Sequence, residues 1–221
     1  MPVVPKLPSS TTNRLEAFSD GVIAIAITLL ILQINVPKSR EGQLFDDLLD
    51  QWPSYAAYAL SFIVIGIMWV SHHTMFERIA SVDRQLLFLN LLLLLGIAFL
   101  PFPTALLAEY VQDGGSNAHI AAAIYSASMT VIGLAFTGLW IHLARRPSLL
   151  IEGADQAALR RSIHRSAVGP AVYGASIGLA FVSAEACLAV YALVALYFAR
   201  GPSSRILDAH GRRIRVKGGN D

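Results

Sequence analysis

Residues 14–32 read RLEAFSDGVIAIAITLLIL, and this stretch decides the class of the fold. A membrane-spanning helix needs about 20 mainly apolar residues to cross roughly 30 Å of hydrocarbon, and the segment 14–36 meets that requirement. Four polar or charged side chains stand at its start: Arg14, Glu16, Ser19 and Asp20. A plain membrane anchor needs no carboxylate there, because a charged group inside the membrane is costly. These side chains therefore require a further role.

The composition of the whole chain indicates a membrane protein. Of its 221 residues, 55% are hydrophobic and only 14% are charged, and the mean hydropathy is +0.55. Soluble domains carry about a quarter charged residues. The single cysteine, Cys187, excludes an intrachain disulfide and a cysteine-based zinc site. The first apolar run opens with acidic rather than basic residues, which is not typical of a signal peptide.

Hydropathy predicts an all-α bundle of six membrane spans. The spans are 14–36, 53–76, 85–108, 118–144, about 165–182 and about 185–200. The last two come from the apolar segment 166–199, which would reach roughly 50 Å as one helix and is too long for a bilayer. We therefore expect a tight hairpin near Ser183–Glu185. The sequence Pro101-Phe102-Pro103 predicts a kink or a break near the external end of the third span.

The distribution of basic residues predicts the orientation of these spans. With six spans, one side of the membrane carries only Lys38 and Arg40 as basic residues, and nearly all other Lys and Arg lie on the opposite side. By the positive-inside rule, the N and C termini are then both cytoplasmic. We expect a disordered cytoplasmic tail at 1–13, a transmembrane domain at 14–200 and a basic cytoplasmic tail at 201–221. The protein is expected to be a multi-pass protein of the cell membrane.

The polar residues of the first span predict contacts with a second helix. Asn13-x-x-Glu16 fits a capping box, which predicts that the helix begins at Arg14. Arg14 and Asp20 lie about 240° apart around a helix, so each must contact a different neighbour. The candidate partners stand at the cytoplasmic end of the second span: Trp69, His72, His73 and Glu77.

Beyond Asp20, one helical stripe continues the face of Arg14 and Phe18. It consists of Gly21, Ile25, Thr28 and Leu32. The stripe fits a packed apolar interface in which the Thr28 hydroxyl is bonded to a preceding carbonyl. The other interpretation is a pore-lining face, with apolar rings that exclude water when closed and one hydroxyl ring that faces an ion.

Three stretches of the sequence resemble the endolysosomal potassium channel family (transmembrane protein 175 type), in particular its single-repeat prokaryotic members. The stretches are Arg14-x-x-x-Phe18-Ser19-Asp20 followed by GVIAIAITLL, Trp69…His72-His73, and Asn90…Leu100-Pro101-Phe102. The length and the six-span layout are similar as well, so the resemblance covers nearly the whole chain.

The resemblance implies a homotetramer with potassium as the permeant ion, no cofactor, and a central pore lined by the first helix of each subunit. Ile25 would form a hydrophobic constriction, and Thr28 a hydroxyl layer linked to potassium preference. Leu29 and Leu32 match further positions of the pore wall. A structural network would hold the first helix in place and would comprise Arg14, Phe18, Ser19, Asp20, Trp69, His72 and His73. The partners expected are further copies of the chain, potassium ions and the lipid bilayer, and no nucleic acid.

The expected function is therefore a weakly selective, leak-type potassium channel, and two alternatives compete with it. A proton-coupled transporter would use Asp20 with His72 or His73 as a proton relay. A hydrolase would use Ser176, because Gly174-Ala-Ser176-Ile-Gly178 matches G-x-S-x-G. That motif lies inside an apolar helix, where its glycines favour close helix packing instead, so we expect no enzyme activity.

Overall fold

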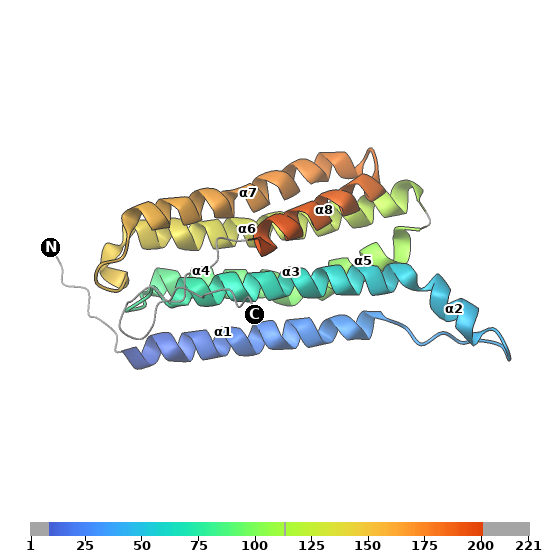
Figure 1. Ribbon diagram of the computed structural model, residues 1–221, viewed down its shortest axis with the longest axis horizontal. Helices are drawn as coiled ribbons and strands as arrows, with labels where there is room; N and C mark the ends of the chain where they lie inside the picture. The colour runs from blue at the N-terminus through green and yellow to red at the C-terminus, as the bar shows by residue number, and fades with distance from the viewer. Residues whose placement is uncertain (1–8, 113, 201–221) are drawn as a thin grey trace, which may run out of the picture.

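The computed structural model describes residues 9–112 and 114–200, and every regular element in these ranges is helical (Figure 1). The elements are α1 (Ser9–Leu29), the 3-10 turn η1 (Leu30–Gln33), α2 (Leu44–Asp50), α3 (Trp52–Phe76), α4 (Arg84–Phe99), α5 (Pro101–Tyr110), α6 (Gly115–Arg145), the 3-10 turn η2 (Pro147–Leu149), α7 (Gln156–Ala180) and α8 (Ala184–Ala199). The predicted all-α class is confirmed.

The long helices lie side by side and alternate in direction along the chain (Figure 1). Helix α1 occupies one edge of the bundle and contacts α3, α4 and α5, whereas α7 lies at the opposite edge and packs on α6 and α8. Because the directions alternate, the start of α1 and the end of α8 point toward the same end of the bundle. The short helix α2 projects from the other end (Figure 1).

Four helical segments are long and apolar enough to cross a membrane, and they match the first four predicted spans. They are Thr11–Gln33, Trp52–Phe76, Arg84–Tyr110 and Gly115–Arg145. The remaining apolar helix, α8, has 16 residues. Residues 181–183 join α7 to α8, next to the predicted hairpin, but α7 begins at Gln156 and not near residue 165.

The predicted start of the first helix is wrong. Helix α1 begins at Ser9, so Asn13 lies inside it and forms no capping box with Glu16. The Glu16 carboxylate instead contacts His73 on α3, because a position within the helix projects this side chain toward the neighbouring helix. The predicted tail 1–13 therefore includes helical residues from Ser9 onward, whereas 1–8 and 201–221 lie outside the described residues.

The break predicted in the third span is confirmed at Leu100, between α4 and α5. Proline has no backbone N–H, so Pro101 and Pro103 leave preceding carbonyls without their usual helical partners. The Thr104 hydroxyl donates to the Leu100 carbonyl at 2.9 Å and also lies 2.8 Å from the Ser61 hydroxyl of α3. Side-chain hydrogen bonds thus hold the break against the neighbouring helix.

A glycine on α6 permits the close approach of α7. A Cβ atom on Gly133 would lie 2.7 Å from Cδ of Pro170, which is too close for a rigid ring to accommodate. The expected close packing at Gly174 and Gly178 is not found: a Cβ on Gly174 would lie 3.9 Å from its nearest neighbour, and one on Gly178 would have none within 4 Å. The tight contact between these two helices is made by the glycine of α6.

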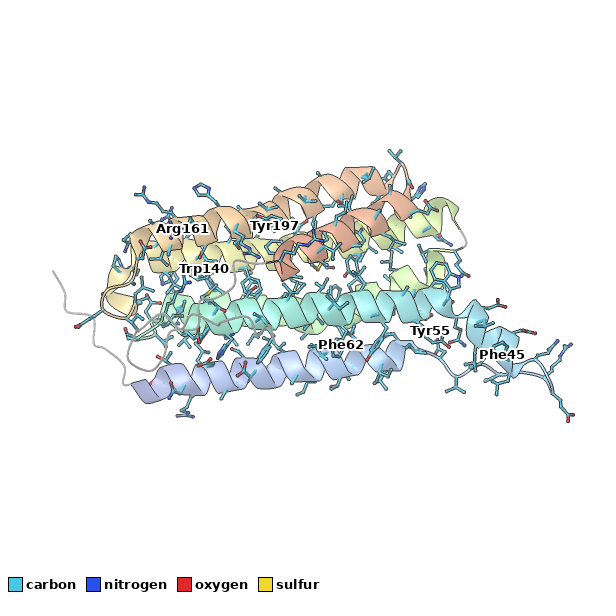
Figure 2. The ribbon with its side chains drawn as sticks, viewed as in Figure 1. Phe45, Tyr55, Phe62, Trp140, Arg161 and Tyr197 are labelled. Carbon is cyan, nitrogen blue, oxygen red and sulfur yellow. The ribbon has the colours of Figure 1, made fainter. Side chains whose placement is uncertain are left out.

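Two loops are joined at the end of the bundle where α1 begins. The Ala80 amide donates to the Leu149 carbonyl at 2.8 Å, which connects the loop after α3 to the loop after α6. His142 lies 3.0 Å from Asp83, the residue that caps the start of α4. The Arg78 guanidinium lies over the ring of Trp140. Figure 2 shows Trp140 near the end of α6. These contacts fix the ends of the helices against which α1 packs.

Candidate functional site: an exposed helix face and its polar anchor

Helix α1 has one buried face, which packs into the bundle. The buried residues of this face are Thr12, Leu15, Ser19, Ile23 and Ala26, and Leu30 in η1 continues it. Their spacing of three or four residues is that of one side of an α-helix. The apolar members of this face join the core formed with α3 and α4, so the packing of α1 uses this side only.

The opposite side of α1 is exposed along its whole length, and we call it the exposed stripe. It comprises Arg14, Phe18, Gly21, Ile25, Thr28, Leu29 and Leu32. The exposed fraction is 60% for Ile25 and 69% for Leu32, which are high values for aliphatic side chains. A continuous apolar surface of this kind in a membrane helix faces lipid or another copy of the chain.

The hydroxyl of Thr28 interrupts this apolar surface. It donates its hydrogen to the Ile25 carbonyl at 2.9 Å, as one of the two predicted interpretations requires. This bond directs the hydrogen back toward the helix and leaves the lone pairs of the oxygen available. An oxygen with available lone pairs can contact a cation, so the bond to the backbone is compatible with a role in a pore.

A set of polar side chains holds α1 against its neighbours, and we call it the polar anchor. Its members are Glu16, Ser19 and Asp20 on α1, Trp69, His72 and His73 on α3, and Asn90 on α4. The Trp69 indole Nε1–H donates to an oxygen of the Asp20 carboxylate at 2.9 Å. The sequence predicts that Asp20 has a partner on the second span, and Trp69 is that partner.

The buried part of the anchor is a chain of hydrogen bonds across three helices. The Ser19 hydroxyl donates to the Leu15 carbonyl at 2.8 Å, so its oxygen accepts from the Asn90 side-chain amide at 2.9 Å. The amide oxygen of Asn90 is then left to accept from Nε2–H of His72, also at 2.9 Å. The direction of each bond follows from the one before it, which assigns the proton of His72 to Nε2.

The outer part of the anchor joins Glu16 to His73. Nδ1 of His73 lies 3.0 Å from the Glu16 carboxylate, and Nε2 lies 3.7 Å from the carboxylate of Glu77, the residue that follows α3. The imidazole therefore lies between two carboxylates at the exposed edge of the contact. Its ring also stacks on Trp69, with centroids 6.0 Å apart.

The structure brings five of the seven predicted network residues together: Ser19, Asp20, Trp69, His72 and His73. Arg14 and Phe18 are not among them, because both lie on the exposed stripe. The Arg14 guanidinium forms neither a hydrogen bond nor an ion pair with any residue in the described ranges. Among the described residues, 9–112 and 114–200, none forms the predicted bracing contact with this arginine.

Two members of the anchor were missing from the predicted network. Asn90 is the one polar residue inside the run LLFLNLLLLLG, and a lone polar side chain within an apolar span indicates a buried partner. Glu16 fits a capping box in the sequence, and that interpretation does not predict its contact with His73. Together the anchor residues fix the rotation of α1 about its own axis, which leaves the exposed stripe facing away from the bundle.

Comparison with known proteins places this site within a family. The family model described as endosomal/lysosomal potassium channel TMEM175 matches residues 14–101, which include the exposed stripe and the polar anchor. A potassium channel of Streptomyces collinus is 53% identical over 188 residues, covering 85% of this chain and 91% of that protein. The chain belongs to the TMEM175 potassium channel family. This is a family of ion channels and not of enzymes, and it implies no cofactor.

The solved structures and the animal relatives define the type of family member. A crystal structure of a lysosomal potassium-selective channel TMEM175 homologue from Chamaesiphon minutus has a TM-score of 0.76 and 39% identity, covering 86% of this chain and 97% of that one. TMEM175 of Gallus gallus, named an endosomal/lysosomal proton channel, is 42% identical over 109 residues, which are 45% of this chain and 22% of that protein. The near-complete match to the bacterial proteins indicates the single-repeat prokaryotic type.

Proposed function

We propose that this protein is a weakly selective, leak-type potassium channel of the cell membrane, in which four copies of the exposed stripe surround a central pore. The observation that carries the proposal is the division of α1 into two faces. One face is held by the polar anchor and the core, whereas the other presents aliphatic side chains and one hydroxyl to the outside. The family to which the chain belongs supports potassium as the ion.

The proposed subunit crosses the membrane six times, with both termini in the cytoplasm. Helices α7 and α8 supply the fifth and sixth spans, joined by a short turn at 181–183. The common direction of the start of α1 and the end of α8 supports an even number of spans (Figure 1). The excess of Lys and Arg at that end supports its cytoplasmic location.

Conduction in this proposal is controlled by the side chains of the exposed stripe. Four Ile25 side chains form a narrow apolar ring, which water and hydrated ions do not enter when the ring is tight. A small tilt or rotation of α1 widens the ring. The ring of Thr28 hydroxyl oxygens replaces part of the hydration shell of the ion, and Leu29 and Leu32 form further pore wall. Few oxygen ligands act at this level, so we expect only a modest preference for potassium over sodium.

Reconstitution of the purified protein into liposomes tests this proposal. We expect single-channel currents, and a potassium flux that exceeds the sodium flux in the same vesicles by a modest factor. Flux should rise in proportion to the ion gradient, because no fixed stoichiometry limits a channel. Saturable exchange coupled to a pH gradient, with no single-channel events, would instead indicate the proton-coupled transporter.

Replacement of Asp20 by Asn separates the channel from that alternative. Asp20 contacts Trp69, whereas His72 contacts Asn90, so the described residues provide no direct hydrogen bond from this carboxylate to His72. Asn retains an oxygen that accepts from the Trp69 indole but carries no titrating proton. We expect Asp20→Asn to conduct potassium at nearly the rate of the unmodified protein in the liposome assay.

Asp20→Leu removes the acceptor of the Trp69 hydrogen bond, at a cost of about 1 kcal/mol, and should reduce the yield of folded protein. Loss of transport in the Asn variant, with normal folding, contradicts the structural role of this carboxylate.

A further inference from the structure

An open pocket of about 300 Å³ lies between α7 and α8, at the end of α8. It is lined by Arg165, Leu193, Leu196, Tyr197 and Arg200. Figure 2 shows Tyr197 near the end of α8, and Arg161 on the part of α7 that extends past that end. The pocket is separate from the exposed stripe and the polar anchor, which lie on α1 and the helices that contact it.

Arg165 is held in a defined position at this pocket. Its guanidinium donates to the Phe198 carbonyl at 2.8 Å, which satisfies one of the backbone oxygens that the last turn of a helix leaves without a partner. The same group lies 5.7 Å from the centroids of the Tyr197 and Phe198 rings. A guanidinium has five N–H donors, so most of them remain available for a ligand. Its charge also offsets the partial negative charge at the end of α8.

The charge of the pocket favours an anion. Two arginines line it, and none of the lining residues is acidic. The nearby Arg161 is already paired with Asp155 at 3.2 Å, whereas Arg200 forms no ion pair within the described part of the chain. Two guanidinium groups that have no carboxylate partner among residues 9–112 and 114–200 suit a phosphate, because their planar N–H pairs match its oxygens.

The apolar wall of the pocket and the length of α8 indicate a lipid as the source of that phosphate. Leu193 and Leu196 are 65% and 49% exposed, so the pocket offers hydrocarbon surface that a free phosphate would not use. The 16 residues of α8 extend about 24 Å, which is shorter than the roughly 30 Å of bilayer hydrocarbon. Arg200 at its end therefore meets the membrane near the inner edge of the head-group layer, where a lipid phosphate can reach it.

We propose that this pocket binds an anionic phospholipid, with the phosphate between Arg165 and Arg200 and an acyl chain along Leu193 and Leu196. The inference depends on the membrane placement proposed above and not on ion conduction. Basic pockets between membrane helices on the cytoplasmic side are suited to anionic head groups. The bound lipid would fill the space beyond the short helix α8 and tie it to α7.

Native mass spectrometry of the purified full-length protein in detergent tests the proposal. The probes are dioleoylphosphatidylglycerol, dioleoylphosphatidylcholine and inorganic phosphate, each titrated separately. We expect the phosphatidylglycerol adduct to form at the lowest concentration, and Arg200→Gln to weaken it by about tenfold through loss of a charge-assisted contact. Arg160→Gln is the matched control, since it removes the same charge from an exposed position of α7 outside the pocket.

Three results would overturn the assignment, and none of them depends on potassium flux. Equal weakening by Arg200→Gln and Arg160→Gln would indicate only general surface attraction. Equal binding of the two lipids would remove the role of the anionic head group. Binding of inorganic phosphate with the same dependence on Arg200, without a preference between the lipids, would assign the pocket to a soluble anion. Arg165→Lys provides a second variant, because it keeps the charge but loses the planar donor pair. It should weaken the binding of phosphatidylglycerol less than Arg200→Gln does.

Discussion

Replacement of Ile25 by Asn is expected to raise the potassium flux of the reconstituted protein by about tenfold, if it lowers the barrier at the constriction by ~1.4 kcal/mol. Ile25 is 60% exposed on a helix whose other face is buried, so the substitution removes little packing within the subunit. In the proposed tetramer, four amide groups would replace four aliphatic side chains at the narrowest point. Water then enters the ring more readily, and a hydrated ion loses less of its shell as it passes. Flux is measured in liposomes under a potassium gradient, with the amount of inserted protein determined in parallel.

The matched control is Ile63→Asn on α3. Ile63 is 52% exposed, so the same change is made at a site of similar exposure that lies outside the exposed stripe. We expect no increase in flux for this variant. An equal increase in both variants would indicate a general leak caused by a polar group in the membrane, and an unchanged flux in Ile25→Asn would contradict the proposed constriction.

Replacement of Asn90 by Leu is expected to cause the largest loss of stability among the anchor variants. Leu has the same number of side-chain heavy atoms and the same branching, so the change removes hydrogen bonds without opening a cavity. The buried Ser19 oxygen loses the amide that donates to it, and Nε2 of His72 loses its acceptor. Nδ1 of His72 already has no partner within the described residues, so the buried ring would keep no hydrogen bond. Each buried group left without a partner costs about 1–3 kcal/mol.

The thermal unfolding of purified protein in detergent measures this loss. We expect a clear fall in the unfolding midpoint for Asn90→Leu and almost none for Asn117→Leu, which makes the same change at an exposed position of α6. The falls in unfolding midpoint caused by separate substitutions of Ser19 and Asn90 should not be additive, because both substitutions break the same hydrogen bond. A midpoint for Asn90→Leu that equals that of the control would mean that the chain of hydrogen bonds contributes nothing to the position of α1.

The first four predicted spans and the two faces of α1 could be predicted, because both depend on local properties of the chain. Hydropathy over about 20 residues identifies a segment that suits hydrocarbon, and the 3.6-residue period assigns Ile25, Thr28 and Leu32 to one side of a helix. The contact between Asp20 and Trp69 could also be predicted, because a carboxylate inside a span requires a partner and the second span contains few polar side chains that could serve as one.

The remaining contacts of the anchor were not predictable in the same way. The pairing of Glu16 with His73 depends on where α1 begins, and a local capping pattern suggested a start five residues too late. The bond from Asn90 to Ser19 depends on α4 packing beside α1, which no local pattern reports. Arg14 was grouped with the anchor by the spacing of a motif, yet its position on the helix places it on the exposed stripe.

The sequence by itself determined that the protein lies in a membrane, which segments form its long apolar helices, and which residues share each side of the first helix. These properties are set by residues close together in the chain. The tertiary structure alone decided which side of α1 is buried and that Asn90 joins three helices, and it also placed Arg165 beside the end of α8. Such contacts join residues tens of positions apart, and they form only because helix packing and the pairing of buried polar groups select one arrangement of the bundle.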